Sequence, residues 1–396
     1  MKFASRLVSF DVAPGDPYRP MATPIYQTAT FEQEQATEFG PYDYSRSGNP
    51  TRTVLEEQLA ILENGRRGFC FSSGMAAITC VTRLLRSGDE ILADSDLYGG
   101  TCRLFTRVLD RTGITARYAD ACDIETFAAQ ITGRTKLLYL ESPTNPLLRV
   151  VDIRQIADLA HANGAVLAVD SSAMSPYLQN PLDLGADIVL HSATKFLCGH
   201  SDVTAGVVVV KDEELAKQFY FLQNAEGSAL GPFDVFLFLR GLKTLKLRLD
   251  CQQKNAQALA EWLQAHPHVN SVNYPGLASS PGYLLQHNQA RGAGAVLSFT
   301  TGSVETSRRI VEATRMFSIC VSFGSINSTI SLPGCMSHAS VPPEVGAFRE
   351  LPADLVRISV GIEDISDLIA DLERAFAAAD TIRHPVTADE DASEVA

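Results

Sequence analysis

The stretch AVLAVDSSAMSPYLQNPLDLGADIVLHSATKFLCGHSDVTAGVVVV (165–210) decides the fold. It contains three short apolar runs, AVLAVD (165–170), DIVLHS (187–192) and GVVVV (206–210). Two similar runs precede it, EILAD (90–94) and KLLYLE (136–141), and helical patterns lie between the runs. Continuous apolar runs of this length that alternate with helices are typical of parallel strands buried on both faces. The sequence therefore predicts an α/β domain with a mainly parallel sheet.

The pattern changes on both sides of this region. Residues 1–52 are rich in Pro, Gly, Tyr and Thr and predict an extended N-terminal arm. We expect a large domain over 53–248, which ends with a helix around 233–248. Residues 249–384 mix helical and strand patterns and predict a smaller α+β domain, and residues 385–396 predict a disordered acidic tail.

Composition excludes several classes of function. The chain has 396 residues and a net charge of −13, with no block of basic residues, which argues against nucleic acid or membrane surfaces as partners. Its eight cysteines form no C-x-x-C pair and indicate reduced thiols. H-E-x-x-H is absent and we expect no metal. The N-terminus lacks the apolar run of a signal peptide, so we expect a cytoplasmic protein.

Candidate chemistry follows the predicted strands, because ligands of parallel sheets bind beyond the carboxyl ends of the strands. Lys195 follows one such strand and lies beside Ser192 and Thr194. A lysine in a partly apolar loop has a lowered pKa, which favours a neutral nucleophile that can form a Schiff base. A solvated surface lysine is the alternative interpretation.

Two other segments support the nucleophile. In FCFSSGMAA (69–77) a glycine-containing loop leads into a helix, which presents backbone N–H groups to a phosphate, although plain helix capping is an alternative. Asp170 ends an apolar strand, where an N-cap or turn residue is the alternative. A lysine, an acidic partner for the ring nitrogen and a phosphate cup are what pyridoxal phosphate requires of a protein.

With these residues, the chain resembles the Cys/Met-metabolism group of pyridoxal-phosphate enzymes. The matching stretches span nearly the whole chain: YSRSGNPTR (44–52), SSGMAA (72–77), DLYGGTCRLF (96–105), ESPTNP (141–146), SATKFLCGHSDVTAG (192–206) and VRISVGIED (356–364). The resemblance implies fold type I: a mainly parallel seven-stranded sheet flanked by helices, plus a smaller α+β C-terminal domain. The runs GPYDYSRSGNPTR, FLQNAEGSALGPFD, LRGLKT and VSFGS followed by MSHAS look most like the plant-type cystathionine β-lyases of this group.

The resemblance also implies roles for individual residues. Lys195 would hold pyridoxal 5′-phosphate and then act as the general base, Asp170 would pair with the ring nitrogen, and Asn145 would bind the phenolic oxygen. Tyr98 would stack on the ring, and either Tyr98 or Lys195 would deliver a proton to the leaving sulfur. The phosphate would be bound by Gly74, Met75, Ser192 and Thr194, and by Tyr44 and Arg46 of a neighbouring subunit.

The substrate implied by the resemblance is a small sulfur amino acid. Arg357 would clamp its α-carboxylate, and Ser322 would orient that carboxylate and the lysine. Arg103, or Arg46 of the adjacent subunit, would face a second carboxylate. Sites shared between subunits require at least a dimer, and the resemblance implies a homotetramer built as a dimer of dimers. The expected reaction is a β-elimination.

Two alternatives stay open. One is a γ-lyase, γ-synthase or sulfhydrylase on the same scaffold. Arg103 also fits the γ-synthase pattern, whereas Asn327 stands where several γ-type relatives carry Glu and argues against a γ-type enzyme. The other is a catalytically silent binding protein that retains the fold.

Overall fold

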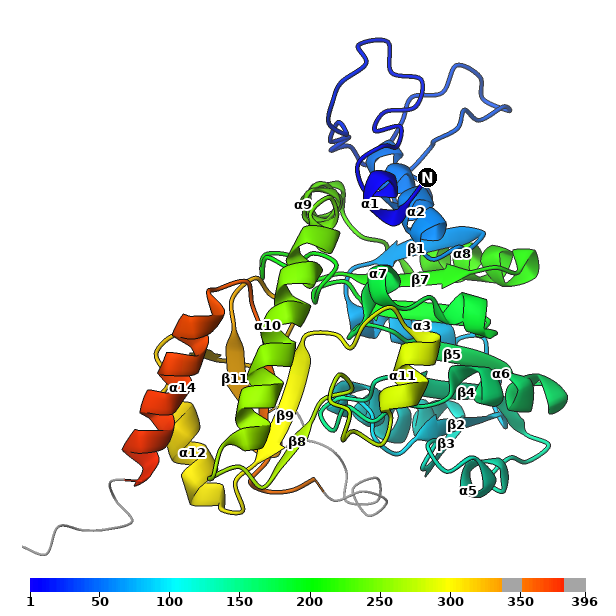
Figure 1. Cartoon of the computed structure of the whole chain (residues 1–396). Helices are drawn as coiled ribbons and strands as arrows, with labels where there is room; N and C mark the ends of the chain where they lie inside the picture. The colour runs from blue at the N-terminus through cyan, green and yellow to red at the C-terminus, as the bar shows by residue number, and fades with distance from the viewer. Residues whose placement is uncertain (337–350, 381–396) are drawn as a thin grey trace, which may run out of the picture.

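The computed structural model describes residues 1–336 and 351–380, and its centre is a seven-stranded sheet (Figure 1). The strand order is β1-β7-β6-β5-β4-β2-β3. The strands are β1 (Arg67–Phe71), β2 (Glu90–Asp94), β3 (Thr115–Ala119), β4 (Thr135–Glu141), β5 (Val166–Asp170), β6 (Ile188–Ser192) and β7 (Gly206–Val210). All pairings are parallel except that β7 runs antiparallel to both β1 and β6. The predicted mainly parallel sheet is confirmed.

Helices cover both faces of this sheet, and β7 shows why its strands are apolar throughout. Val208 and Val210 belong to the cluster that includes side chains of α3 (Gly74–Thr82) and α8 (Glu213–Glu226). Val207 and Val209 belong to the cluster on the other face, with α2 (Pro50–Leu62). Because successive side chains of a strand point to opposite faces, burial of both faces requires an unbroken apolar run.

The other helices near the large sheet are short. They are α1 (Phe3–Arg6), α4 (Gly99–Arg103), α5 (Ile124–Ala128), α6 (Ile153–Ala162), α7 (Ser175–Leu178) and α11 (Tyr283–Gln289). A π-helical turn (Leu104–Val108) and two 3₁₀ turns (Leu109–Thr112, Pro181–Leu184) complete this part.

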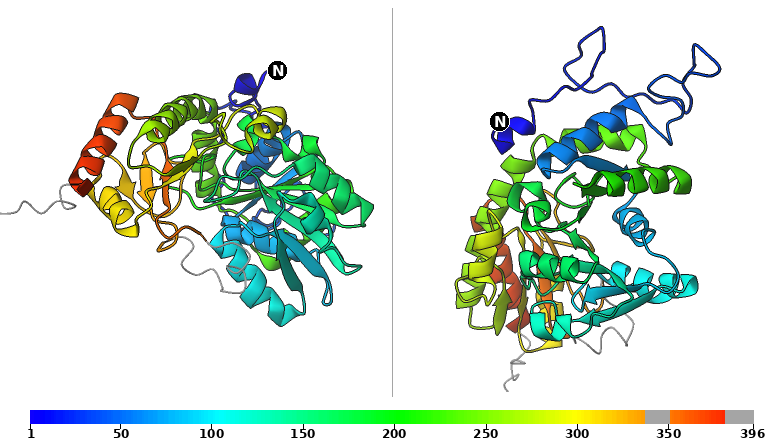
Figure 2. Two further views of the ribbon diagram at one scale, coloured as in Figure 1. Left: turned by 60° about the horizontal axis from the view of Figure 1, so that its bottom comes forward. Right: turned by 90° about the vertical axis from the view of Figure 1, so that its right-hand side faces the viewer.

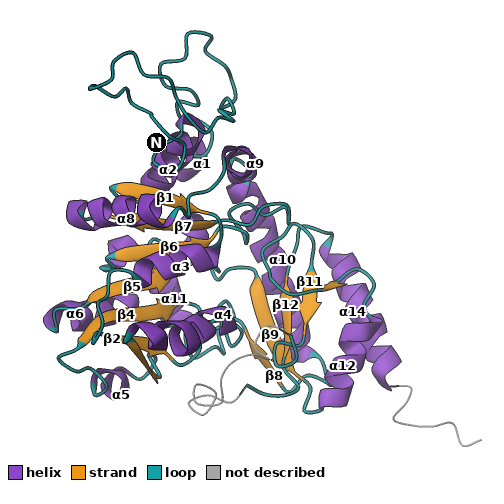
Figure 3. Ribbon diagram, turned by 180° about the vertical axis from the view of Figure 1, so that it is seen from behind, coloured by secondary structure: helices purple, strands orange, loops and turns teal. Residues whose placement is uncertain are grey.

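A second sheet lies beside the first and has five strands in the order β10-β11-β12-β9-β8 (Figure 3). Its strands are β8 (Ser271–Asn273), β9 (Val296–Thr300), β10 (Ser318–Ile319), β11 (Thr329–Ser331) and β12 (Val356–Ser359). The helices α10 (Leu245–Ala265), α12 (Val304–Ala313) and α14 (Ile365–Asp380) pack together with this sheet.

One helix boundary differs from the prediction. The single helix expected over 233–248 is broken, because α9 (Pro232–Leu242) ends before Lys243 and α10 begins at Leu245. Residue 248, proposed as the end of the large domain, therefore lies near the start of α10. The domain division itself stays a prediction, and the acidic tail 385–396 lies outside the described residues.

The N-terminal residues lie outside both sheets. Residues 7–49 contain no helix or strand segment, and their loops project beyond the body of the molecule (Figure 2). They are tied to α2 at its start, where the Asn49 side chain accepts the backbone N–H of Thr51 and donates to the carbonyl of Tyr26. Among the described residues no helix is long and apolar enough to cross a membrane.

Candidate active site

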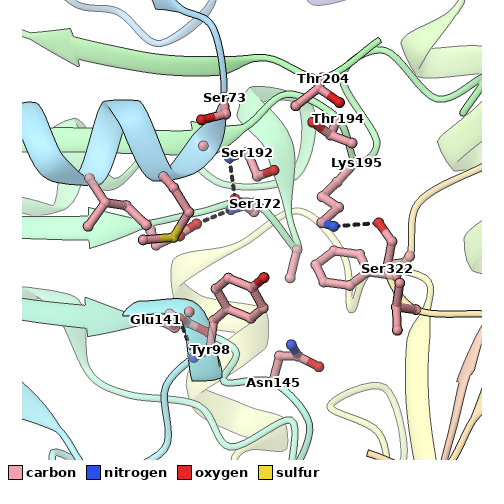
Figure 4. Close-up of a pocket in the computed structure, with 18 of the residues that line it drawn as sticks. Ser73, Tyr98, Glu141, Asn145, Ser172, Ser192, Thr194, Lys195, Thr204 and Ser322 are labelled. Carbon is pink, nitrogen blue, oxygen red and sulfur yellow. Dashed lines mark hydrogen bonds between the residues drawn. The ribbon is translucent and has the colours of Figure 1, made fainter. Parts of the chain in front are cut away.

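A cavity of about 430 Å³ lies at the carboxyl ends of the parallel strands, where the two sheets meet (Figure 4). Its walls come from the loops after β4, β5 and β6, from the start of α3 and from β12. All the predicted site residues except Tyr44 and Arg46 line it: Gly74, Met75, Tyr98, Arg103, Asn145, Asp170, Ser192, Thr194, Lys195, Ser322 and Arg357.

Lys195 is held in a tight loop after β6. Its backbone N–H donates to the carbonyl of Ser192 at 3.1 Å, and its own carbonyl accepts the N–H of Gly199 at 2.9 Å. The Lys195 amine donates to the hydroxyl of Ser322. Burial, and then the positive charge of Arg357, lower the pKa of this amine to about 8. The neutral, nucleophilic amine is therefore a far larger fraction near neutral pH than for an ordinary lysine.

Ser322 is held in an unusual backbone conformation. Its φ is +81°, in the left-handed region that residues other than glycine rarely adopt. Such strain persists where the surrounding structure over-determines it, and it is concentrated at functional sites. The conformation brings the hydroxyl to the Lys195 amine and the carbonyl to Arg357.

Asp170 lies at the carboxyl end of β5, in register with Glu141 of β4. Its carboxylate accepts the backbone N–H of Ser172 at 2.9 Å, and the hydroxyl of Tyr139 lies 3.5 Å away. Burial raises the pKa of Asp170. A buried carboxylate at a cavity wall is stabilised by a cationic N–H donor, and a protonated ring nitrogen is such a group.

The start of α3 is pressed against the ends of β6 and β7. Ser73 caps the helix by accepting the N–H of Ala76 at 3.1 Å. A Cβ on Gly74 would lie 2.9 Å from the Cβ of Ser192, and one on Gly206 would lie 2.2 Å from the carbonyl oxygen of Ser73. Only glycines permit this approach, which places a helix N-terminus beside the hydroxyl-bearing residues Ser192 and Thr194. These groups fit a phosphate.

Arg357 reaches the cavity from β12. One of its terminal nitrogens donates to the side-chain oxygen of Asn145 at 2.9 Å and the other to the carbonyl of Ser322 at 2.7 Å. Burial lowers its pKa to about 10. Both partners are neutral oxygens, so the charge of this buried guanidinium is available to a carboxylate ligand.

Tyr98 projects into the same space as Asn145 and Lys195 (Figure 4). Its backbone N–H donates to the carboxylate of Glu141 at 2.8 Å. This contact with the end of β4 holds the Tyr98 ring at the cavity, where a flat aromatic ligand can stack on it.

Tyr44 and Arg46 do not line the cavity of their own chain. The Arg46 side chain donates to Asn224 at 3.1 Å, and its guanidinium carbon lies 5.2 Å from the centre of the Tyr44 ring. Both were assigned to a neighbouring subunit's site, and that assignment stays a prediction. Residues 337–340 of the MSHAS motif lie outside the described residues.

The sequence analysis assigned no role to three residues of the site. Glu141 is the last residue of β4, just as Asp170 is the last residue of the neighbouring β5. This equivalent position could have marked Glu141 in the sequence as a residue of the site. Ser172 links two strands, because its N–H donates to Asp170 and its hydroxyl accepts the N–H of Ser192 at 2.6 Å. The Phe323 ring lies 5.1 Å from the Lys195 amine nitrogen. Neither Ser172 nor Phe323 carries a pattern that marks it in sequence.

Comparisons with known proteins agree with this geometry. The chain is 56% identical over 361 residues to "Cystathionine beta-lyase, chloroplastic" of Arabidopsis thaliana, which covers 91% of this chain and 78% of that protein. It is 57% identical over 361 residues to the protein of the same name in Mimosa pudica, covering 91% and 79%. A crystal structure of cystathionine gamma synthase from Xanthomonas oryzae in complex with cystathionine has a TM-score of 0.93 and 40% identity, covering 96% of this chain and 99% of that chain.

These matches confirm fold type I and the resemblance to plant-type enzymes. The cofactor also fits the cavity, which brings together a lysine amine, the Asp170 carboxylate and the start of α3 with the hydroxyl groups of Ser192 and Thr194. A family model described as "Cys/Met metabolism PLP-dependent enzyme" matches residues 5–377, so the chain belongs to the Cys/Met metabolism family of enzymes that depend on pyridoxal phosphate.

Proposed function

We propose that this protein is a cystathionine β-lyase of methionine biosynthesis, which converts L-cystathionine and water into homocysteine, pyruvate and ammonia. The observation that carries the proposal is the Lys195 amine, which is buried in one cavity with Asp170 and Arg357 and has a pKa of about 8. The plant relatives that bear this name support the choice of substrate.

Lys195 performs two tasks in this reaction. When bound, pyridoxal phosphate supplies an electrophilic carbon for amines and an electron sink for the charge that develops at the substrate Cα. The Lys195 amine holds the cofactor until substrate arrives, and its nitrogen then accepts the proton from Cα. The Ser322 hydroxyl, already bonded to this nitrogen, keeps it oriented. Asp170 keeps the ring nitrogen protonated by its negative charge.

The other residues bind and orient. Gly74, Met75, Ser192 and Thr194 hold the phosphate. Arg357 clamps the α-carboxylate with its two parallel N–H donors, and Asn145, which now accepts one of them, contacts the phenolic oxygen. Arg103 faces the distal carboxylate of cystathionine. Tyr98 would lie against the ring, and its hydroxyl or the Lys195 amine would give a proton to the leaving sulfur.

Product analysis tests the reaction type. Cofactor-loaded protein is incubated with L-cystathionine, and the products are identified by mass spectrometry. Pyruvate with homocysteine supports the proposal, whereas 2-oxobutyrate with cysteine identifies a γ-lyase. Absence of cleavage, together with activity on homoserine esters with cysteine or sulfide, identifies a γ-synthase or sulfhydrylase.

The sequence argument against a γ-type enzyme rests on Asn327. This residue is exposed and does not line the cavity.

A silent binding protein is tested by colour. The active protein should show a visible absorption band after reconstitution with the cofactor, and Lys195→Ala should abolish it. A colourless wild type would favour the silent alternative.

We also propose a cytoplasmic homotetramer in which Tyr44 and Arg46 complete the phosphate site of a neighbouring subunit. Arg46→Ala should then weaken cofactor retention. The matched control is Asn224→Ala, which removes only the bond that Arg46 makes inside its own chain. Equal retention in Arg46→Ala and wild type, or equal loss in both variants, would contradict a role across the subunit interface.

A further inference from the structure

Arg248 is a buried arginine whose hydrogen bonds go to neutral oxygen atoms. It lies in the first turns of α10 and does not line the cavity. Its terminal nitrogens donate to the carbonyls of Phe196 at 2.8 Å, Leu197 at 3.3 Å and Gly241 at 3.0 Å. Its Nε donates to the hydroxyl of Thr244 at 3.1 Å. The guanidinium therefore joins the loop that follows Lys195 to the break between α9 and α10.

Desolvation of this charge is costly, and it lowers the pKa of Arg248 to about 10. The carbonyl of Gly241 lies in the last turn of α9, at the negative end of the helix dipole, and it also accepts the backbone N–H and the hydroxyl of Thr244. A cation is favoured there, and the planar fork of arginine satisfies several carbonyls at once.

Two glycines lie in close contact around the guanidinium. A Cβ on Gly199, which has φ +73°, would lie 2.1 Å from Arg248 Nη1. A Cβ on Gly241 would lie 2.3 Å from the carbonyl oxygen of Cys198. Two glycines thus let the Lys195 loop and the end of α9 close around the arginine, and Gly199 itself accepts no side chain at this φ without strain.

The same face of α10 continues the pattern toward the second sheet. Gln252, one turn further, donates to the carbonyls of Ser325 at 2.8 Å and Val360 at 3.0 Å. Asn255 donates to the carbonyls of Gly361 at 3.3 Å and Glu363 at 2.8 Å. These segments follow Ser322 and Arg357, so one helix face contacts the chain just after Lys195, Ser322 and Arg357.

We propose that Arg248 is a positioning residue for Lys195: its guanidinium fixes the main chain just after the lysine, so that the amine stays at the Ser322 hydroxyl and at the reacting carbon. It acts through the loop and touches neither substrate nor cofactor. The inference rests on the proposed role of Lys195, but it does not depend on which sulfur amino acid is cleaved.

The direct test is Arg248→Lys in the cofactor-loaded enzyme, because lysine keeps the charge and loses the planar fork. We expect kcat to fall roughly 10- to 100-fold with little change in KM, since a misplacement of about 1 Å costs this much in rate. The rate at which stripped protein regains the visible band of lysine-bound cofactor should fall as well, which a purely structural role would not cause far below the melting temperature. Arg240→Lys, at an exposed position of α9, is the matched control and should behave as wild type.

A folded Arg248→Lys variant with wild-type kcat and wild-type cofactor uptake would overturn the proposal. If this variant does not fold, Thr244→Val removes one anchor of the guanidinium and Thr244→Ser retains it. We then expect slower uptake and a lower kcat in the valine variant alone, and equal behaviour of the two would overturn the proposal. Should the wild type cleave no cystathionine, the uptake rates still test Arg248, so failure of the proposed reaction is distinguishable from failure of this inference.

Discussion

The reactivity of Lys195 can be measured against another lysine of the same chain. Burial and Arg357 lower its pKa from the ordinary 10.5 to about 8, which corresponds to ~3 kcal/mol in favour of the neutral amine. At pH 8 about half of the Lys195 amines are then neutral, against roughly 0.3% of ordinary lysines. Lys217 is fully exposed and its pKa is raised by the nearby Glu214, so it is an internal reference.

The assay labels cofactor-free protein with a trace of an acylating reagent at a series of pH values and quantifies each modified lysine by peptide mass spectrometry. Labelling of Lys195 should rise with a midpoint near pH 8, well below that of Lys217. Arg357→Met removes the neighbouring positive charge and should move the midpoint of Lys195 upward, because burial alone then opposes protonation. Titration of Lys195 together with Lys217 would refute the argument.

Three further perturbations test other parts of the structure. Ser322→Ala and Ser322→Gly both remove the hydroxyl at Lys195 and should lower kcat. Because glycine adopts φ +81° without strain, the glycine variant should be about 1 kcal/mol more stable than the alanine variant in denaturant titrations. Equal stabilities of the two variants would contradict backbone strain at this position. Glu141→Ala leaves the Tyr98 N–H without its acceptor, so it should lower the free energy of unfolding by about 1–3 kcal/mol and raise KM. Glu141→Gln retains an acceptor oxygen and should have smaller effects. Identical effects of the two variants would argue against this contact. Asn49→Ala removes the N-cap of α2 and should cost about 1 kcal/mol in thermal unfolding, whereas Asn49→Ser keeps a capping oxygen and should cost less; equal losses would argue against the cap.

The sequence predicted the five inner strands of the large sheet and missed its two edge strands, β1 and β3. The runs 90–94, 136–141 and 206–210 are unbroken apolar segments, and each is a strand. The edge strand β3 (Thr115–Ala119) carries Arg117, since one side of an edge strand faces solvent, and its pattern is correspondingly weak. The helix break at Lys243 lacks Pro and Gly at the break itself and gave no local signal.

The site was predictable where a side chain itself performs the chemistry. Lys195 and Asp170 follow strands and stood out by position. Arg248 did not, because an arginine in an amphipathic helix ordinarily faces water, and only the fold brings carbonyls from residues 196, 197 and 241 around it. The place of Arg46 depends on a second chain, which no pattern within one sequence can supply.

The polar face of α10 has a consequence for how this scaffold can change. Arg248, Gln252 and Asn255 bond to backbone oxygens, and a backbone oxygen is present whatever residue stands at that position. The residues at 196, 325 and 360 can therefore change without direct loss of these bonds, but Phe196 and Val360 are buried in the core and accept only side chains of similar volume. Libraries aimed at new substrates can randomise positions that line the cavity, such as Ala173 and Val321, while leaving the three helix residues untouched, so the frame that holds the lysine is inherited by every variant.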